Sequence, residues 1–497
     1  MRYVEQGINK DLVDFIRFLI TVFIMHDIII IGAGVTGCFI ARELAKYNLD
    51  VVVLEKNNDV GNETTSANSA IVHSGYDPLP GSLKAKLNVE GNAMFDKVCE
   101  QLDVSFKRIG SITVALDEKQ LETLKELQIR AKENGVETIL LNKEELLKEE
   151  PLLTDEVVGG LLAPTAGIID PFNLCVHLME NAIDNGVKLV INEEVTSIRK
   201  ENGYFVVNDK YQAKLVINAT GVNGDLINEL VNDKTFDIMP RKGQYYVFDH
   251  FNYPFVKHTL FMVPSEKGKG VLISPTTSGN YLVGPSANLV ARDEKTTDKP
   301  TLANVKVQAN LVVKNIPYYE TIRTFAGLRA TPSTHDFIIE ESETENFINV
   351  VGIESPGLAS SPAIAKKVVE EIVAKKFDLV EKENYNPRVK KYVKLKPMSI
   401  EEKQEYYKQN KDYGMIICKC EQVSKGEILD CLNRSCPPRS IKGLKRRLRV
   451  GFGKCQGGMC QSDALKILAE FYNVDPKEIP YDGEKAFILL KKTKGEN

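Results

Sequence analysis

Four cysteines near the C-terminal end of the chain have the spacing of ligands to a metal centre. They form two close pairs, Cys418-x-Cys420 and Cys455-x4-Cys460. Thiolates paired in this way can hold either zinc or an iron–sulfur cluster. Zinc sites usually use C-x2-C knuckles, whereas C-x-C is tighter, and the glycine-rich segment 451–458 offers backbone N–H groups to sulfur. We therefore expect a 2Fe–2S cluster on these thiolates, with zinc as the alternative.

A glycine motif near the start of the chain has the spacing of a dinucleotide-binding turn. The apolar run IIII ends in Gly32-x-Gly34-x-x-Gly37, and a second apolar run, VVVL, ends at Glu55. The first glycine permits a tight turn, the second lets a pyrophosphate approach the backbone, and the third lets the helix pack on the strand. The carboxylate of Glu55 can accept hydrogen bonds from both ribose hydroxyls, which favours FAD or NAD over NADP. A strand–helix turn without a ligand is the alternative.

Three further segments are rich in small or short polar residues, which suits contact with a bound nucleotide. The run TTSANSAIVHSGY follows Glu55, LVINATG ends an apolar strand, and GIESPGLAS opens a helix. The positive N-terminus of that helix can stabilise the anionic edge of a reduced flavin. The candidate cofactor-binding residues are Gly32, Ala33, Gly34, Gly37, Glu55, Thr65, Ser66, Asn68, Ser69, Ala219, Thr220, Gly221, Gly352, Gly357 and Leu358.

A histidine and two arginines suit acid–base chemistry on an anion. His73 precedes Ser74-Gly75, where a turn can present its imidazole, and a reference pKa of about 6.5 suits a general base near neutral pH. Arg323 and Arg329 lie in IRTFAGLRATPS, where an arginine can anchor an anion. The alternatives are a histidine bonded to the backbone of a packed loop, and ordinary surface arginines.

The elements that must position these residues alternate between strand and helix in the first half of the chain. Between 240 and 325 the pattern changes to short strands with Gly, Pro and Ser turns, which indicates an antiparallel sheet inserted into the nucleotide fold. We expect strands at 28–31, 51–55, 111–116, 188–198 and 215–218, and helices from 35 to about 48, at 82–102, through the charged stretch 117–149, near 303–313 and after 357.

A short basic helix is expected just before the second cysteine pair. We interpret it either as a solvated face or as a docking surface for an acidic electron-transfer partner. Its cations are Lys442, Lys445, Arg446, Arg447 and Arg449.

Composition limits the class of protein. A net charge of −4 over 497 residues argues against nucleic acid as the main partner. Six of the nine cysteines lie between 418 and 460 in a chain without a signal peptide, which indicates metal rather than disulfides. The apolar run 18–25 is far shorter than the ~20 residues needed to cross a bilayer. We interpret 1–24 as the product of an upstream start, with a membrane-surface helix or a docking segment as alternatives.

Several of these segments together resemble the FAD-dependent D-amino-acid-oxidase-like family. They are the glycine motif, NSAIVHSGY, TAGIIDPF, Ala219-Thr220-Gly221 and GIESPGL. The four cysteines resemble those of the bacterioferritin-associated-ferredoxin-type 2Fe–2S domain. The combination of the two modules is similar to the large subunits of anaerobic glycerol-3-phosphate dehydrogenases.

The resemblance implies an α/β fold, with a Rossmann-like FAD-binding domain, an inserted antiparallel β-sheet substrate domain and a small α-rich C-terminal 2Fe–2S domain. It places Glu55 on the adenosine ribose and the backbone of Val195 on adenine. It places His73 near the substrate hydroxyl, Arg329 by the substrate anion and Lys242 near the pocket. The expected divisions are an extension at 1–24, the oxidoreductase at 26–375 with insertions at about 105–160 and 240–325, a charged linker at 378–412, the 2Fe–2S domain at 413–475 and a tail at 476–497.

One segment departs from the pattern of the glycerol-3-phosphate enzymes. These usually carry Gly-Gly-Lys-x-x-Thr-x-Arg after the last strand, where this chain has Gly352-Ile353-Glu354-Ser355-Pro356-Gly357. That version, together with PGSLKAKL, resembles L-2-hydroxyglutarate oxidases. A lysine and an arginine expected at a substrate phosphate are therefore missing.

The expected function is a cytoplasmic FAD-dependent dehydrogenase of a small anionic secondary alcohol, at most peripheral to a membrane. The first substrate is sn-glycerol 3-phosphate, giving dihydroxyacetone phosphate, and the alternative is L-2-hydroxyglutarate or another 2-hydroxy acid. Electrons would pass through FAD and the 2Fe–2S cluster to a partner subunit or a quinone-linked acceptor. Two other classes stay open: a non-catalytic electron-transfer or assembly subunit, and a zinc-stabilised regulatory protein.

Overall fold

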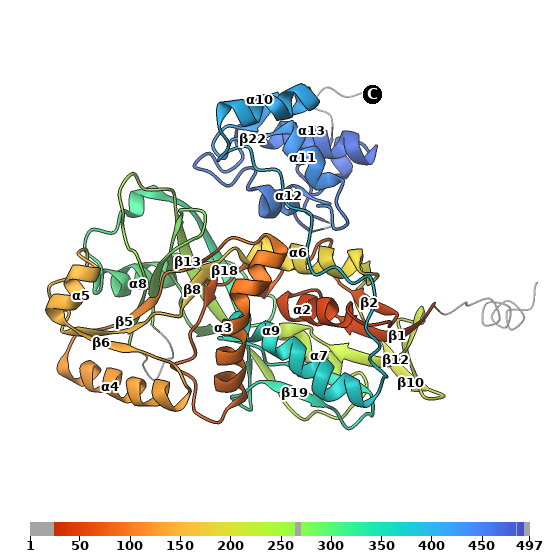
Figure 1. The fold of residues 1–497 in the computed structure, drawn as a ribbon, viewed down its shortest axis with the longest axis horizontal. Coiled ribbons are helices and arrows are strands. Elements are labelled where there is room, and N and C mark those ends of the chain that lie inside the picture. Colours follow the sequence, from red (N-terminus) through yellow and green to blue (C-terminus); the bar gives the residue numbers. More distant parts are fainter. Residues whose placement is uncertain (1–23, 264–269, 484, 492–497) are drawn as a thin grey trace, which may run out of the picture.

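A buried parallel sheet lies at the centre of the larger part of the molecule (Figure 1). The structure is a computed structural model, and it describes residues 24–263, 270–483 and 485–491. The strands of this sheet are β1 Ile24–Ile31, β2 Val51–Leu54, β9 Lys188–Val190, β10 Ile198–Glu201, β11 Tyr204–Val207, β12 Tyr211–Asn218, β19 Ile338–Glu341 and β20 Phe347–Val351. The pairs β20–β12, β12–β1, β1–β2 and β2–β9 are parallel, and β10, β11 and β19 add antiparallel edges.

The apolar runs of β1 and β2 explain why this sheet is buried on both faces. Alternate residues of a strand point to opposite faces, so Ile28 and Ile30 belong to one core and Ile29 and Ile31 to another. Runs of β-branched residues are typical of a parallel strand covered on both sides. Helices cover the first face, and their bounds are α2 Val35–Leu44, α3 Leu83–Leu102, α6 Pro171–Asp184 and α9 Gly357–Lys367.

A second, nine-stranded sheet lies beside the first (Figure 1). Its strands are β5 Ser111–Ala115, β6 Ile139–Asn142, β7 Gly159–Ala163, β13 Ile238–Phe248, β14 Thr259–Met262, β15 Leu272–Pro275, β16 Tyr281–Gly284, β17 Asn288–Leu289 and β18 Thr321–Pro332. Every pair is antiparallel except β14–β5. The predicted fold class is confirmed, and strands from both predicted insertions join in this one sheet.

The remaining elements of this part of the chain connect or cover the two large sheets. A small antiparallel sheet of three strands supports the segment that contains His73. The elements are β3 Ile71–Val72, β4 Phe106–Arg108, β8 Gly167–Ile169, the 3-10 turn η1 Thr64–Ser66, and the helices α4 Glu118–Glu133, α5 Lys143–Glu149, α7 Gly224–Asn228 and α8 Lys299–Asn310. No helix in the described part of the chain is long and apolar enough to cross a bilayer.

Two expected elements differ in the structure. The charged stretch 117–149 is not one helical region, because Gly135 adopts a φ of +76° after α4 and the chain then forms β6. Asn142 caps α5 in a box with Glu145, which starts a separate helix. The strand expected at 188–198 is also broken, since Asn192 adopts a φ of +55° and turns the chain away from β9.

The C-terminal domain is a small helical unit with its own core (Figure 1). Its elements are α10 Ile400–Gln409, β21 Ile416–Cys418, β22 Val423–Ser424, α11 Lys425–Leu432, α12 Ile441–Leu448 and α13 Gln461–Tyr472. The stretch interpreted as a linker is partly structured, because Tyr392 is buried in this core and the Leu395 N–H donates to Glu427 Oε1 at 3.0 Å. The predicted extension at 1–24 lies outside the described residues, apart from Ile24.

The basic helix α12 is neither a solvated face nor a docking surface. It packs against α6 of the larger domain, and Lys445, Arg446 and Arg447 are all buried. The guanidinium of Arg447 donates to both carboxylate oxygens of Asp59, at 2.6 and 2.8 Å, and neither side chain is more than 3% exposed. Arg446 and Arg447 of this helix therefore join the two domains.

We expect Arg447→Leu to destabilise the holoprotein by about 3–5 kcal/mol, because it leaves the Asp59 carboxylate buried without a partner. The matched control is Arg388→Leu, which breaks the exposed pair with Glu100 and should cost less than about 1 kcal/mol. Urea unfolding followed by far-ultraviolet circular dichroism measures both. Equal effects of the two variants would contradict a structural role for the interdomain pair.

Candidate active site

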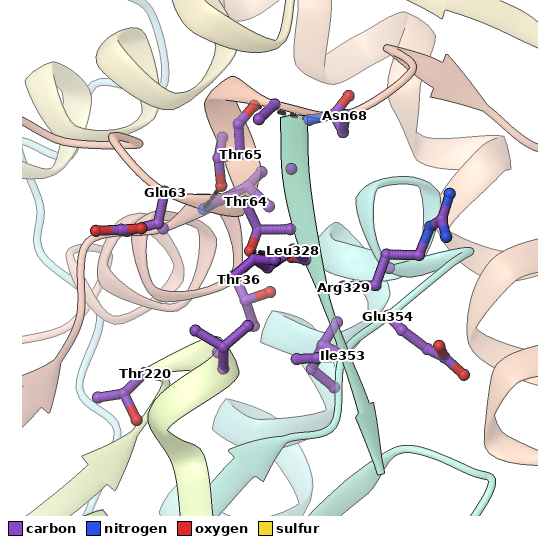
Figure 2. Close-up of a pocket in the computed structure, with 18 of the residues that line it drawn as sticks. Thr36, Glu63, Thr64, Thr65, Asn68, Thr220, Leu328, Arg329, Ile353 and Glu354 are labelled. Carbon is purple, nitrogen blue, oxygen red and sulfur yellow. Dashed lines mark hydrogen bonds between the residues drawn. The ribbon is translucent and has the colours of Figure 1, made fainter. Parts of the chain in front are cut away.

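A cavity of about 800 Å³ opens between the carboxyl ends of the parallel strands and the second sheet. The residues that directly follow β1, β2 and β12 line one side of it, and β13 and β18 line the other. Ligands of α/β proteins bind at this edge of a parallel sheet. Figure 2 shows part of the cavity, with Thr65, Thr220 and Arg329 approaching it from three different segments of the chain.

The glycine motif has the backbone geometry that a dinucleotide requires. Gly32 has a φ of +101°, and a Cβ on it would lie 2.7 Å from the Ala219 carbonyl oxygen. A Cβ on Gly37 would lie 2.1 Å from the Gly32 oxygen, so helix α2 packs directly on the turn. A Cβ on Gly34, by contrast, would meet only one atom within 4 Å, which is Thr65 Oγ1 at 3.6 Å. The backbone is therefore open to a phosphate group at the N-terminus of α2.

Glu55 is held rigidly at the end of β2. Its Oε2 accepts from the Ala33 N–H at 2.8 Å, and its Oε1 accepts from the Asn57 N–H at 2.9 Å. Burial raises the pKa of Glu55 above its ordinary value, although these donors act in the opposite direction. The carboxylate lines the cavity. Val195, which follows the break after β9, lines the same cavity.

The loop after Glu55 forms the wall between the two sheets. Thr65 Oγ1 accepts from the Val35 N–H at 3.0 Å, and Thr64 donates to the Leu328 oxygen at 2.7 Å. Asn68 Nδ2 donates to the Thr65 oxygen at 2.7 Å, and the Ser69 and Tyr245 hydroxyls lie 2.8 Å apart. The loop is thus bonded both to the start of α2 and to the strands of the substrate side.

The structure brings most of the predicted cofactor residues to the cavity. Four do not line it: Ala33 and Gly37 shape the turn from behind, the Ser66 hydroxyl donates to Asn62 and Glu63 oxygens, and Gly352 adopts a φ of +68° against Pro332. Those that line it are Gly32, Gly34, Glu55, Thr65, Asn68, Ser69, Val195, Ala219, Thr220, Gly221, Gly357 and Leu358.

His73 lies at the substrate end of the same cavity. Asn88 and Asn92 each donate to its backbone oxygen, at 2.7 and 2.9 Å, and its ring stacks on Phe261 with centroids 5.5 Å apart. The backbone and one face of the ring are thereby fixed. The imidazole is positioned to exchange a proton with a group bound in the cavity.

Two arginines approach the cavity from adjacent strands. Arg241 on β13 and Arg329 on β18 are directly opposite in the register, and both line the cavity. Arg329 Nη2 lies 3.0 Å from where a Cβ of Gly243 would be, so that glycine leaves room for the guanidinium. Among the described residues Arg241 has no hydrogen-bond or ion-pair partner. Paired guanidinium groups of this kind can bind phosphate or carboxylate.

Lys242, predicted near the pocket, points to the other face of β13. Its ammonium contacts Glu294 Oε1 and the Thr296 oxygen, both at 3.1 Å, and it is not among the cavity-lining residues. Successive side chains of a strand alternate between faces, so the presence of Arg241 in the cavity excludes Lys242 from it. Arg241 was not predicted from the sequence, because alternation along β13 places one of the two neighbours in the cavity but does not say which.

The unusual run after Gly352 is tied to the other unusual segment, PGSLKAKL. Glu354 Oε1 accepts from Lys84 Nζ at 2.8 Å, and its Oε2 accepts from the Thr331 hydroxyl at 2.7 Å. Glu354 lines the cavity beside Arg329 (Figure 2). The ion pair with Lys84 offsets the charge of Glu354, so the arginines keep theirs for a ligand.

The four predicted metal ligands meet in the C-terminal domain as two pairs. Cys420 and Cys455 lie with their sulfurs 3.7 Å apart, and Cys418 contacts Cys460. A Cβ on Gly453 would lie 2.4 Å from Cys420 Cβ, so a glycine is needed where the loops meet. Burial and the neighbouring Cys418 raise the pKa of Cys460 to about 12. Binding to iron would deprotonate such a thiol.

Comparison with known proteins identifies both parts of the chain. Residues 27–371 match the family described as FAD dependent oxidoreductase, and residues 416–470 match the BFD-like [2Fe-2S] binding domain. The chain belongs to the FAD-dependent oxidoreductases. This oxidoreductase uses FAD and a 2Fe–2S cluster, which confirms the predicted cofactors and decides between the cluster and zinc. The glycine turn and the open backbone at Gly34 fit the dinucleotide.

Three relatives show how this oxidoreductase compares with others. A glycerol 3-phosphate dehydrogenase of Caloramator mitchellensis is 45% identical over 95% of this chain and 100% of its own. The structure of reduced L-alpha-glycerophosphate oxidase from Mycoplasma pneumoniae with FAD bound has a TM-score of 0.70 and 32% identity, over 73% of this chain and 98% of its own. A mitochondrial L-2-hydroxyglutarate dehydrogenase of Arabidopsis thaliana is 26% identical over 70% of this chain and 83% of its own.

We expect Cys420→Ser to remove the iron–sulfur absorbance and most bound iron while FAD stays bound, because the two cofactors occupy separate domains. Cys99→Ser, a buried cysteine of the larger domain, is the control and should keep its iron. Iron analysis and visible spectra of the purified proteins measure this. Full iron content in Cys420→Ser would exclude that residue as a ligand.

Proposed function

We propose that this oxidoreductase is a dehydrogenase that converts sn-glycerol 3-phosphate to dihydroxyacetone phosphate. The observation that carries the proposal is the meeting of His73, Arg241 and Arg329 in the cavity that contains the glycine motif. A base and two cations suit a small secondary alcohol with an anionic group. A relative that is 45% identical over 95% of the chain is named for glycerol 3-phosphate, and a solved structure that is 32% identical is named for L-alpha-glycerophosphate, which supports the same substrate.

The residues of the chain divide the work of this reaction. Arg241 and Arg329 hold the phosphate and so orient the substrate carbon toward the nucleotide side of the cavity. His73 takes the proton of the substrate hydroxyl as general base. The β13–β18 wall and the loop 64–70 exclude water from the reacting carbon. When bound, FAD supplies the two-electron acceptor and the 2Fe–2S cluster the one-electron carrier.

The cluster domain favours a dehydrogenase over an oxidase. The match to the relative named as a dehydrogenase covers 95% of this chain. The match to the Mycoplasma oxidase structure covers only 73% of this chain, although it covers 98% of the oxidase. That shorter match corresponds to the extent of the oxidoreductase domain alone. A chain with its own one-electron carrier can pass electrons to a protein or a quinone-linked acceptor instead of oxygen.

We infer that the acceptor approaches the cluster from the side of Cys420. Cys418 and Cys460 are buried, whereas Cys420 is exposed and Cys455 is half-buried. The Met459 side chain beside them is 69% exposed. A partner subunit that docks on this exposed surface would reach the cluster from the side away from the buried pair.

L-2-hydroxyglutarate is the second candidate substrate. It is favoured by Glu354 and its ion pair with Lys84, since these occupy the segments that resemble L-2-hydroxyglutarate oxidases. The relative of that name is 26% identical, which makes it the more distant of the two candidates. A carboxylate would occupy the same two arginines as a phosphate.

A non-catalytic electron-transfer subunit is the candidate of another class. Such a subunit has no use for a base and an unpaired arginine beside its flavin. Anaerobic mixing of the holoprotein with glycerol 3-phosphate tests the choice, because only an enzyme loses its flavin absorbance. The same mixing is repeated with L-2-hydroxyglutarate. If neither substrate bleaches the flavin, both enzymatic candidates are contradicted.

We expect His73→Gln to slow flavin reduction by glycerol 3-phosphate about 10²- to 10⁴-fold, the usual contribution of a general base. FAD content should be unchanged, since the side chain lies at the substrate end. Anaerobic stopped-flow absorbance measures the rate, and His250→Gln, an exposed histidine, is the control. A reduction rate equal to that of the unchanged protein would remove His73 from the mechanism.

We expect Arg241→Gln and Arg329→Gln each to lower kcat/KM for glycerol 3-phosphate about 10- to 100-fold, because a hydrogen bond to a charged group contributes about 1.5–3 kcal/mol. The slow reaction of glycerol, which has no anion to hold, is the substrate control and should be unchanged. Steady-state assays with an artificial one-electron acceptor measure both. Equal losses with the two substrates would show that the arginines support the fold and do not bind the phosphate.

A further inference from the structure

A second cavity of about 600 Å³ lies between the flavin domain and the cluster domain. The loop 62–70 separates it from the first cavity and lines both of them. Helix α12 and Phe452, which leads into Cys455, form the opposite wall. The space therefore lies between the segment that borders the flavin site and the segment that carries the cluster ligands. Its volume is in the range of sites for small organic ligands, about 300–1,000 Å³.

The walls of this interdomain cavity carry an excess of positive charge. Its cations are Lys295, Arg323, Lys442, Lys445, Arg446 and Arg449, and its lining carboxylates are Glu63, Asp170 and Asp482. Like charges gathered away from water repel one another, and a fold retains them only where something compensates their charge.

Two of these cations, Arg323 and Lys445, have no carboxylate partner. Among the described residues the Arg323 side chain forms no hydrogen bond or ion pair, and Lys445 Nζ bonds only Gln456 Oε1, at 3.2 Å, although Lys445 is 94% buried. Arg446 is equally buried and pairs with Asp482 at 3.2 Å, but its Nε has no partner within the described residues. Burial, followed by the charges of Arg323, Lys442 and Arg449, lowers the pKa of Lys445 to about 8.

Other polar and aromatic groups complete the lining. The buried hydroxyl of Thr276 also lacks a partner among the described residues and belongs to the same cavity. The ring of Phe452 lies between Arg449 and Lys445, with their charged groups 4.2 and 5.1 Å from its centroid. The cavity thus combines unsatisfied donors with a flat apolar wall, which suits a ligand with an anionic end and a planar end.

We propose that the interdomain cavity binds a phosphate-bearing small molecule of about mononucleotide size, in addition to FAD, with Arg323 and Lys445 as its anion ligands. The bound phosphate compensates the charge of the cations, and so holds α12 and the cysteine loop against the flavin domain. This inference does not depend on the substrate of the enzyme.

Calorimetric titration of the phosphate-free, full-length holoprotein tests the inference, with inorganic phosphate and adenosine 5′-monophosphate as probes. We expect saturable binding that Arg323→Gln and Lys445→Gln each weaken at least tenfold. The control is Lys454→Gln, whose exposed ammonium pairs with Glu320 near the same loop and should leave binding unchanged. Because the substrate site also binds an anion, the titrations are repeated in Arg329→Gln, where binding at the interdomain cavity should persist.

Thermal unfolding gives a second readout that a purely structural role would not produce. In phosphate-free buffer Lys445→Gln should raise the melting temperature, since it removes repulsion, but it should lose the further rise that phosphate causes in the unchanged protein. Tighter binding of the nucleotide than of phosphate supports a mononucleotide, and equal binding supports a free oxyanion in the same site. No saturable binding, or binding that Arg329→Gln alone abolishes, would overturn the inference.

Discussion

The relative position of the two redox centres depends on buried ion pairs between the domains, foremost the one between Asp59 and Arg447, which the pair between Glu180 and Arg434 accompanies. Asp59 lies between β2 and the loop that lines the flavin cavity, and Arg447 lies on the helix that leads into Cys455. Removing both charges from water is costly, and a bidentate geometry is needed to offset that cost. Because other orientations of the domains would leave the charges unpaired, the pair specifies one arrangement. The proposed electron transfer from the first domain to the second is favoured by such a fixed arrangement.

In the flavin cavity the carboxylate is paired with a cation, whereas the two arginines are not paired with an acid. This excess of positive charge favours an anionic ligand. The charge of Glu354 is compensated by Lys84, so it does not neutralise the arginines beside it. The Arg241 side chain has no partner within the described chain, and Arg329 reaches only the Ser286 oxygen, at 3.5 Å. In the proposed function a cation on β13 takes the place of the lysine and arginine expected in the run after Gly352. A chain that departs from the glycerol-3-phosphate pattern would in this way still hold a phosphate.

The sequence predicts those parts of the site that depend on local spacing. The turn at Gly32, the acid at Glu55 and the pairs Cys418–Cys420 and Cys455–Cys460 each lie within one short segment, so their geometry follows from the chain itself. Arg241 and Lys242 differ, because which of two neighbouring residues faces the cavity depends on the register of β13 against β18. That pairing joins strands about 80 residues apart, and no local pattern fixes it.

The basic helix shows a further limit of the same kind. Its cations were interpreted as a surface because charges at helical spacing usually face water. Their partners lie far away in the chain, at Asp59 and Asn62, and only the fold brings them together. The same fold leaves Arg323 and Lys445 without acids, although it buries Lys445 as deeply as Arg446. If the helix faced water, neither its buried ion pairs nor its buried cations without acids would be expected. An interface between the domains that also binds an anion accounts for both.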